Sequence, residues 1–414
     1  MSSRWVACAA VLLAACHSRV PASISPPVPV AAAAELGFDS TRLAAVAAYV
    51  ASQVDSAFPG AVVAVGRHGR LALLAAAGHY GTDDPRPVDP QTIYDLASLT
   101  KVIGLTTACM TLVAEGRLDL DAPVRAYVPE FRGPDKERVT IRHLLTHASG
   151  LPAWRPLFRE ARDRRTALAL VDTTPLDSVP GSHFVYSDLG AILLMQVVER
   201  ITGERIDHYL TRRVFEPLGM TSTRYLPPGS WRDRLAPTEI DTAFRHRLIR
   251  GEVHDENAGR MGGVSGHAGL FSTAPDLARF AAWLLDTYGR EQGARSSSLT
   301  ASDTHPAPCS ALCVSSDVVV QFTRRQGIPP GSTRALGWDT PSDSGYSSAG
   351  KKLSRASFGH TGFTGTSIWM DPERDLFVIL LTNRVNPTRA NTKILQVRAT
   401  VADLVADALL PLRP

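Results

Sequence analysis

The pattern of apolar residues predicts a β-hairpin near each end of the chain. Residues 61–65 and 71–77 are rich in β-forming residues and flank a polar turn at 67–70. Residues 366–370 and 377–381 repeat this arrangement near the other end. Between the hairpins the pattern is mostly helical. These positions predict an α/β (α+β) fold, with one antiparallel sheet built from both chain ends and flanked by helices, and with a mostly helical domain inserted between them.

Helical spacing of apolar residues predicts the helices that cover this sheet. A first helix begins after Asp39, which is a favourable N-cap, and a last helix spans residues 391–410. Residues 189–201 and 274–288 show the same spacing, and the second segment begins with a capping pattern and a proline in its first turn. The expected organisation is an α/β domain of residues 36–95 and 260–414 and a helical domain of residues 96–259.

The first residues are expected to be a targeting signal that is separate from the fold. Arg4 precedes an apolar stretch at residues 5–15, which is too short to span a bilayer. Leu13-Ala-Ala-Cys16 is similar to a bacterial lipoprotein box. At such a box the signal is removed and the cysteine is lipid-modified. The alternative is simple secretion, with cleavage near this position. We therefore expect a signal peptide at 1–16, lipidation at Cys16 and a tether at 17–35. The protein would be exported to the periplasm or cell envelope and would meet the membrane through its lipid anchor only.

The composition is that of an ordinary globular protein. The chain has 414 residues, of which 44% are hydrophobic and 20% are charged, so it can bury a large core. The net charge is only +4 and the arginines are interleaved with acids, which is typical of solvated helix faces and gives no reason to expect a nucleic-acid partner. The five cysteines fit no zinc pattern, and no metal or cofactor is expected. After export, Cys309 and Cys313 could form a short local disulfide.

The heptapeptide DLASLTK at residues 95–101 carries the first candidate chemistry. If a helix begins near Ser98, then Lys101 lies on the same face, with about 5–6 Å between the two Cβ atoms. A helix N-terminus also supplies free N–H groups where an oxyanion would form. The following residues, 102–114, are apolar all round, which indicates a buried helix that would hold a nucleophile rigidly. A second Ser-x-x-Lys, at 348–351, lies in a Gly/Ser-rich stretch without such a helix, so the context favours Ser98.

Two more motifs follow in chain order. Tyr186-Ser-Asp188 stands before the apolar helix at 189–198, and His360-Thr-Gly362 stands before the last hairpin. With Ser-x-x-Lys, these motifs resemble the three signatures of the serine β-lactamase and penicillin-binding-protein superfamily. The chain is most similar to the class-C-like branch, which includes β-lactamase-related serine hydrolases, DD-carboxypeptidases, D-aminopeptidases and esterases. Further similarity lies at residues 142–152, 253–258 and 266–274.

The resemblance implies a fold of the β-lactamase/transpeptidase type and a role for each motif residue. Ser98 would attack an acyl carbonyl, and Lys101 and Tyr186 would share the removal of its proton. The backbone N–H groups of Ser98 and Phe363 would form the oxyanion hole. The residues implied in substrate binding are Asp188, His360, Thr361, Gly362 and His267. Water would then release the acyl group from Ser98. The implied partner is a small-molecule or peptidoglycan-derived substrate.

Two departures from the family pattern bear on the substrate. Asp188 stands where most relatives have asparagine. An ionised carboxylate only accepts hydrogen bonds, whereas an amide also donates them. The Asp188 carboxylate would also hold Lys101 charged, which moves the role of base toward Tyr186. His360 replaces the commoner lysine, so it offers a substrate carboxylate a positive charge only when it is protonated. These departures favour hydrolysis of an ester or a D-amino-acid peptide or amide, of the DD-carboxypeptidase or esterase type. A β-lactamase and a non-catalytic cell-wall peptide-binding relative are the alternatives.

Two unrelated interpretations of the sequence are weaker. Residues 345–351 match most of a phosphate-loop pattern, but Lys352 stands where serine or threonine should bind magnesium, and no strand precedes the match. An α/β-hydrolase needs Gly-x-Ser-x-Gly, and the nearest match, at 263–267, ends in histidine.

Four other polar residues lie within the segments of further similarity. His147, in Leu-Thr-His-Ala-Ser-Gly, is interpreted as a turn residue. His267 lies next to a glycine on one side and near a second, and both loop packing and substrate contact remain open for it. Asp255 and Asn257 are expected to brace the cleft without taking part in the reaction.

Overall fold

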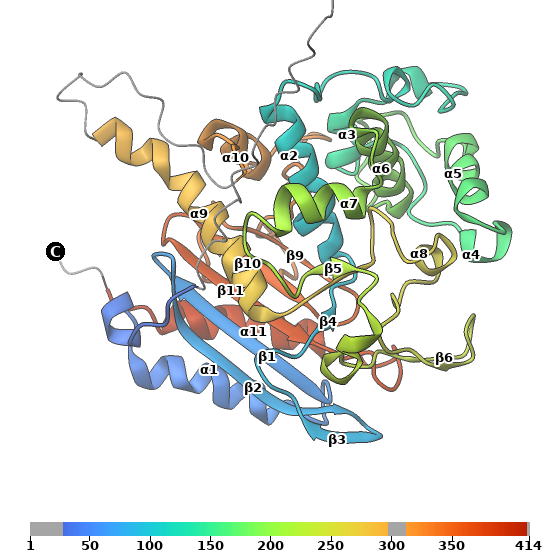
Figure 1. The fold of residues 1–414 in the computed structure, drawn as a ribbon. Helices are drawn as coiled ribbons and strands as arrows, with labels where there is room; N and C mark the ends of the chain where they lie inside the picture. The colour runs from blue at the N-terminus through green and yellow to red at the C-terminus, as the bar shows by residue number, and fades with distance from the viewer. Residues whose placement is uncertain (1–27, 297–311, 412–414) are drawn as a thin grey trace, which may run out of the picture.

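The computed structural model describes residues 28–296 and 312–411 and contains a six-stranded sheet at its centre (Figure 1). All neighbouring strands are antiparallel, and their order is β3-β2-β1-β11-β10-β9. The strands are β1 (Gly60–Arg67), β2 (Arg70–Gly81), β3 (Asp84–Pro87), β9 (Phe358–Thr361), β10 (Ser367–Asp371) and β11 (Leu376–Thr382). The predicted antiparallel sheet with flanking helices is therefore confirmed.

The two ends of the chain meet where β1 pairs with β11. The register places Val63 opposite Leu380 and Val65 opposite Val378. Successive residues of β1 enter different cores: Val62 packs in the core on one face of the sheet and Val63 in the core on the other. Both faces are covered, which explains why these strands are almost continuously apolar.

Helices cover both faces of the sheet. On one face α1 (Ser40–Ser52) and α11 (Ile394–Asp407) lie side by side, and on the other α9 (Ala274–Ser296) crosses β1 and β11 (Figure 1). Asp39 caps α1 by accepting hydrogen bonds from the backbone N–H groups of Thr41 and Arg42, as its position in the sequence predicts.

The middle of the chain is mostly helical and lies beside α9 (Figure 1). Its longest helix is α6 (Asp188–Thr202), which ends at Gly203 in the left-handed conformation. The other helices of this region are η2 (Lys101–Thr106), α2 (Thr107–Ala114), η3 (Val124–Ala126), η4 (Lys136–Arg138), α3 (Ile141–Leu145), α4 (Leu157–Glu160), α5 (Arg164–Thr173), α7 (Ile206–Leu210), η5 (Thr211–Phe215), η6 (Gly229–Arg234) and α8 (Glu256–Arg260).

Several short elements were not predicted from the sequence. A three-stranded sheet in the order β4-β8-β5 joins the two regions. The short elements are β4 (Tyr94–Asp95), β5 (Arg224–Tyr225), β6 (Ile240–Asp241), β7 (Arg247–Leu248), β8 (Leu270–Ser272), η1 (Ala33–Leu36) and α10 (Ser316–Thr323). Strands of two or three residues are too short to show a period of two. The domain boundaries drawn from the sequence stay predictions.

Residues 29–31, which fall within the predicted tether, pair with the start of β2. The N–H of Leu71 donates to the carbonyl of Pro29 at 2.8 Å, and the N–H of Ala31 donates to the carbonyl of Leu71 at 2.9 Å. Because β3 pairs only near the far end of β2, the start of β2 has an open edge, and residues 29–31 fill it. Residues 1–27, with the predicted signal and Cys16, lie outside the described residues, as does Cys309. No described helix has the combination of length and hydropathy that a membrane span requires.

Candidate active site

Ser98 lies in the turn between β4 and the helical segment η2–α2. The preceding residue, Ala97, has a φ of 46°, which is a left-handed conformation that residues with a Cβ rarely adopt. The N–H of Lys101 donates to the carbonyl of Ser98 at 3.0 Å, so the helical turn begins where it was expected. The first turns, η2, are wound as a π-helix, a form that often occurs at functional sites. The segment is buried, as its apolar sequence predicts.

The ammonium group of Lys101 is surrounded by three acceptors. Its Nζ atom donates to Ser98 Oγ at 3.0 Å and to the carbonyl of His267 at 3.1 Å, and it forms an ion pair with Asp188 Oδ1 at 2.7 Å. Burial lowers the pKa of Lys101, but Asp188 and the nearby Tyr186 outweigh burial and hold that pKa above its usual value. Lys101 is therefore charged at neutral pH.

Tyr186 lies just before α6, and other side chains hold its ring in place. The Nζ atom of Lys101 lies 4.8 Å from the ring centroid. The His147 ring packs on it with a centroid distance of 4.6 Å, and the guanidinium of Arg334 lies 5.7 Å from it. The N–H of Ser187 donates to His147 Nδ1 at 3.1 Å, so that nitrogen carries no proton. Burial lowers the pKa of His147 well below its usual value and keeps the imidazole neutral.

His147 therefore does more than form a turn. Its φ of 55° is the left-handed conformation expected of a turn residue. Its ring, however, also contacts Tyr186, and its nitrogen fixes the backbone next to Tyr186. Sequence reasoning missed this second contact because the two residues lie far apart in the chain.

The His360-Thr-Gly motif places its residues along β9 and the loop that follows. His360 Nδ1 lies 2.8 Å from the carbonyl of Thr361 and donates to it, and His360 Nε2 has no hydrogen-bond partner among the described residues. Burial, together with Arg334 and Lys101, lowers the pKa of His360 well below its usual value. The imidazole is therefore neutral at neutral pH, and the positive charge of the cleft comes from other residues.

Gly362 brings this loop against the segment that carries Ser98. A Cβ atom at Gly362 would lie 2.3 Å from the carbonyl oxygen of Leu96 and 2.2 Å from Thr366 Oγ1, so a larger residue would push the two segments apart. Phe363 follows, and the residue is 48% exposed. In the described part of the chain, the backbone N–H groups of Ser98 and Phe363 donate no hydrogen bond.

His267 departs from the expected substrate contact. Its residue is 1% exposed, Nε2 lies 2.8 Å from Asp255 Oδ1, and Nδ1 lies 2.8 Å from Ser265 Oγ. With both ring nitrogens occupied and the ring buried, the side chain has no route to a substrate. What reaches the site is its backbone carbonyl, which binds Lys101.

The carboxylate of Asp255 and the amide of Asn257 brace this region. Asp255 caps α8 by accepting the N–H of Ala258 at 2.7 Å, and Asn257 bonds to the backbone of Arg155 and Phe158. The ligand atoms of Asp188, Asp255 and His267 lie within 4.8 Å of one another, a spacing at which residues can hold a metal ion. Asp188 is already paired with Lys101, and His267 is hydrogen-bonded to Asp255, so we interpret the cluster as a set of internal polar contacts.

Three arginines open on the cleft beside Ser98. The cleft encloses a cavity of about 460 Å³, whose lining includes Ser98, Tyr186, His360, Phe363 and the arginines Arg334, Arg384 and Arg398. Arg334 comes from a loop before β9 and Arg398 from α11. Neither belongs to a motif, and nothing in the local sequence signals that they meet at the cleft.

Arg398 is buried at the cleft, as is Arg384. It is 6% exposed, and its Nη2 donates to the carbonyls of Gly362 and Thr366 at 2.5 and 2.8 Å. Within residues 28–296 and 312–411, Arg398 forms no ion pair, and its Nε has no hydrogen-bond partner. Burial lowers the pKa of Arg398 to about 10, so the group is still charged at neutral pH.

Comparisons with known proteins show the family and support the fold. The family model described as Beta-lactamase matches residues 44–402. A protein of Salmonella agona named "Putative D-alanyl-D-alanine carboxypeptidase" is 30% identical, and the alignment covers 87% of each chain. Among solved structures, EstCE1, "a hydrolase with promiscuous acyltransferase activity", has a TM-score of 0.67 at 21% identity and covers 87% of this chain and 99% of its own. A penicillin-binding protein homologue from Caulobacter crescentus has a TM-score of 0.67 at 20% identity, with coverage of 89% and 99%. The two structures support the fold.

Proposed function

This chain belongs to the beta-lactamase family of serine hydrolases, and we propose that it is a DD-carboxypeptidase, which removes the last D-amino acid from a peptidoglycan stem peptide. The scissile bond would lie over Ser98, and the free carboxylate of the last residue would lie toward Arg334 and Arg398. The name of the Salmonella relatives supports the same reaction class.

The observation that carries this proposal is the uncompensated charge of Arg398. A buried guanidinium is stable only when its N–H groups are bonded and its charge is balanced. Arg398 has two carbonyl acceptors and an unpartnered Nε, and it opens on the cavity that contains Ser98. Arg334 adds a second unpartnered nitrogen, Nη1, and its Nε lies 3.7 Å from the carboxylate of Asp339. A substrate carboxylate in the cavity would supply the missing negative charge.

Tyr186 is the base that this arrangement favours. Lys101 is held as an ammonium group, which has three donors and no acceptor, so it has no lone pair for the Ser98 proton. The positive charges of Lys101 and Arg334 lie 4.8 and 5.7 Å from the centroid of the Tyr186 ring, so charge that develops on Tyr186 during proton transfer would face two cations. Lys101 then serves to orient the Ser98 hydroxyl and to balance charge.

The reaction would proceed through an acyl-enzyme. Tyr186 takes the proton of Ser98 while Ser98 Oγ bonds to the carbonyl carbon, and the oxyanion lies between the N–H groups of Ser98 and Phe363. The C–N bond breaks as Tyr186 passes the proton to the departing D-amino acid. Water attacks the ester with Tyr186 again as base, and Ser98 Oγ regains its proton as the shortened peptide leaves.

A matched pair of substrates tests the proposal. Diacetyl-L-lysyl-D-alanyl-D-alanine should release D-alanine, and its C-terminal amide should react about 100-fold more slowly in kcat/KM. Arg334→Gln should remove most of this preference for the acid. Arg355→Gln is the matched control, because Arg355 has a side chain that is 78% exposed and pairs with Asp343.

Two outcomes would contradict the proposal. Hydrolysis of p-nitrophenyl acetate without release of D-alanine would make the protein an esterase. Ser98→Ala should keep the fold and lose turnover, and undiminished hydrolysis in that variant would remove Ser98 as the nucleophile.

The proposed substrate agrees with an exported protein. Peptidoglycan lies outside the inner membrane, and the first 16 residues have the pattern of a lipoprotein signal. We therefore propose that the enzyme acts in the cell envelope, anchored through lipid on Cys16.

A further inference from the structure

The two N–H groups proposed to bind the oxyanion lie on different segments, and Asp95 bonds to both segments. Its Oδ1 accepts the N–H of Ala97, the residue before Ser98, at 2.8 Å. Its backbone carbonyl accepts the hydroxyl of Thr364, the residue after Phe363, at 2.7 Å. Asp95 is 2% exposed, so these bonds form away from water, where they are strong and costly to lose.

The bond to Ala97 bears directly on the nucleophile. A left-handed φ of 46° is unfavourable for alanine, and the surrounding structure must hold it. The Asp95 carboxylate closes a turn that ends at Ala97, of the kind that aspartate side chains stabilise. The orientation of the Ser98 N–H and hydroxyl follows from that turn.

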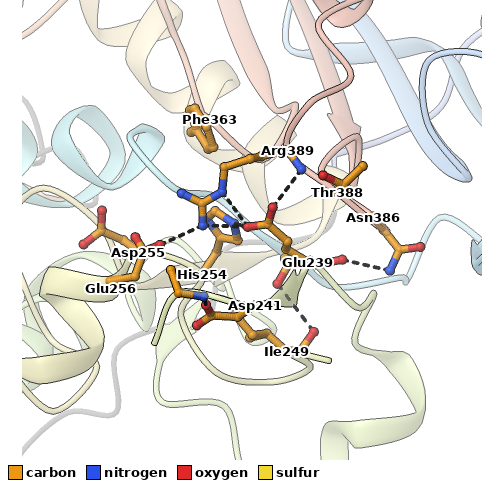
Figure 2. Close-up of polar contacts among 12 residues, drawn as sticks. Glu239, Asp241, Ile249, His254, Asp255, Glu256, Phe363, Asn386, Thr388 and Arg389 are labelled. Carbon is orange, nitrogen blue, oxygen red and sulfur yellow. Dashed lines mark hydrogen bonds and ion pairs between the residues drawn. The ribbon is translucent and has the colours of Figure 1, made fainter. Parts of the chain in front are cut away.

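The second carboxylate oxygen of Asp95 reaches the other side of the oxyanion hole. It accepts the N–H of His254 at 2.6 Å, and the His254 ring stacks on the Phe363 ring with centroids 5.7 Å apart and planes at 27°. Figure 2 shows how the ring is held: His254 Nε2 lies 2.9 Å from Glu239 Oε2, and Arg389 pairs with the same oxygen at 2.6 Å. The support behind Phe363 is therefore a bonded network.

Phe363 is also held by Arg384. Arg384 Nε donates to its carbonyl at 2.8 Å, and the guanidinium lies 4.4 Å from its ring centroid. The hydroxyl of Thr366 donates to the carbonyl of Leu96 at 3.0 Å and ties the same two segments together. These contacts hold the ring and the carbonyl of Phe363 while its N–H stays available to a substrate.

We propose that Asp95 is the positioning residue of the oxyanion hole, an inference that rests on the proposed roles of Ser98 and Phe363. Its carboxylate and carbonyl join the Ser98 turn, the Phe363 loop and the His254 support, so that the two N–H groups keep one relative position during the reaction. Asp95 touches neither the substrate nor the reacting atoms, and its effect on the rate comes through the two donors.

Asp95→Asn tests this role, because the amide keeps the shape but replaces one acceptor with an NH₂ group that opposes the N–H of Ala97 or His254. We expect kcat/KM for p-nitrophenyl acetate to fall about 100-fold, through kcat more than KM. The affinity for phenylboronic acid, whose tetrahedral adduct with Ser98 places an oxygen in the hole, should fall by about the same factor. A merely structural role would lower the melting temperature and leave the boronic acid affinity of the folded protein unchanged.

A milder variant covers the case in which Asp95→Asn does not fold. Thr364→Val removes only the hydroxyl bond to Asp95 and should lower both quantities about 10-fold. Thr323→Val is the control, since it removes a buried hydroxyl that bonds to Val319 within α10. It should leave kcat/KM and the affinity for phenylboronic acid within about twofold of the wild-type values.

Folded Asp95→Asn or Thr364→Val protein with wild-type affinity for the boronic acid would overturn the inference. Neither probe carries a C-terminal carboxylate, so the result does not depend on the peptide specificity. Wild-type protein that hydrolyses the ester but not D-alanyl-D-alanine would count against the proposed function alone.

Discussion

Lys101 Nζ and Asp188 Oδ1 lie 2.7 Å apart and form an ion pair next to Ser98. The lysine side chain is 4% exposed and the carboxylate 20%, so water screens the pair only weakly. Asp188 is the first residue of α6, and its charge is also favourable at that helix N-terminus. This ion pair sets the protonation state of the lysine next to the nucleophile.

Asp188→Asn should change both the base and the substrate range. Without the carboxylate, burial dominates and the pKa of Lys101 falls, so a neutral lysine becomes available at lower pH. The acidic limb of the kcat/KM profile for ester hydrolysis should therefore move to lower pH. Labelling of Ser98 by a fluorescent penicillin should rise about 10-fold, because the new amide can donate a hydrogen bond to the acyl carbonyl. Asp39→Asn, at the N-cap of α1, is the control. An unchanged profile and unchanged labelling would show that Asp188 does not govern Lys101.

The contact between His147 and Tyr186 should be separable from the turn that His147 forms. His147→Asn keeps a residue that tolerates the left-handed conformation and supplies an oxygen for the Ser187 N–H, but it loses the ring. We expect a melting temperature within a few degrees of wild type and a kcat about 10-fold lower. His147→Ala should lose both stability and rate. Equal rates in wild type and His147→Asn would mean that the ring does not position Tyr186.

His267 should act on the rate through its backbone carbonyl. His267→Leu leaves Asp255 without its partner, disturbs the carbonyl that binds Lys101, and should lower kcat about 10-fold or more with little change in KM. His267→Gln can still donate to Asp255 and should recover part of the rate. Ser265→Ala removes only the outer contact and should stay within about threefold of wild type. A His267→Leu enzyme with a raised KM and an unchanged kcat would instead indicate a substrate contact.

The buried Glu239 should make the protein sensitive to acid. Burial raises the pKa of Glu239, but hydrogen bonds from His254 and Arg389 outweigh it and lower that pKa to about 2. The pKa of Glu239 is lower in the folded protein than in the unfolded chain, where it is near 4.5, so the ionised group stabilises the fold by about 3 kcal/mol when the pH is above 4.5. This contribution is lost as the pH falls toward 2. Urea unfolding between pH 7 and pH 2 should therefore show Glu239→Gln to be less stable at pH 7, with the difference shrinking toward pH 2. A constant difference across this range would contradict the assignment.

Lipidation at Cys16 can be tested on the full-length precursor. Metabolic labelling with an alkyne analogue of palmitate should mark the wild-type protein in the membrane fraction. Cys16→Ser should lose the label and move to the soluble fraction of the envelope. Cys8→Ser is the matched control, since Cys8 lies in the part of the proposed signal that would be removed. An unlabelled wild-type protein would favour simple secretion.

Much of the fold was predictable from local patterns. Hairpins show a period of two and polar turns, and helices show apolar residues every three or four positions, so β1, β2, β10, β11, α1, α6, α9 and α11 are visible in the sequence. The motif spacing likewise determined that Lys101 and Ser98 are neighbours, because three residues of one helical turn bring them together.

The surroundings of these motifs depend on contacts that are distant in sequence. The sequence predicts that His267 and His360 bind the substrate. In the structure the His267 side chain is buried away from the cleft, and burial keeps the His360 imidazole neutral. Arg334 and Arg398, which supply the charge of the cleft, belong to no motif. Local backbone geometry depends on neighbouring residues and can be read from the sequence. Desolvation and electrostatic pairing depend on which segments pack together, and for this protein only the tertiary structure decided them.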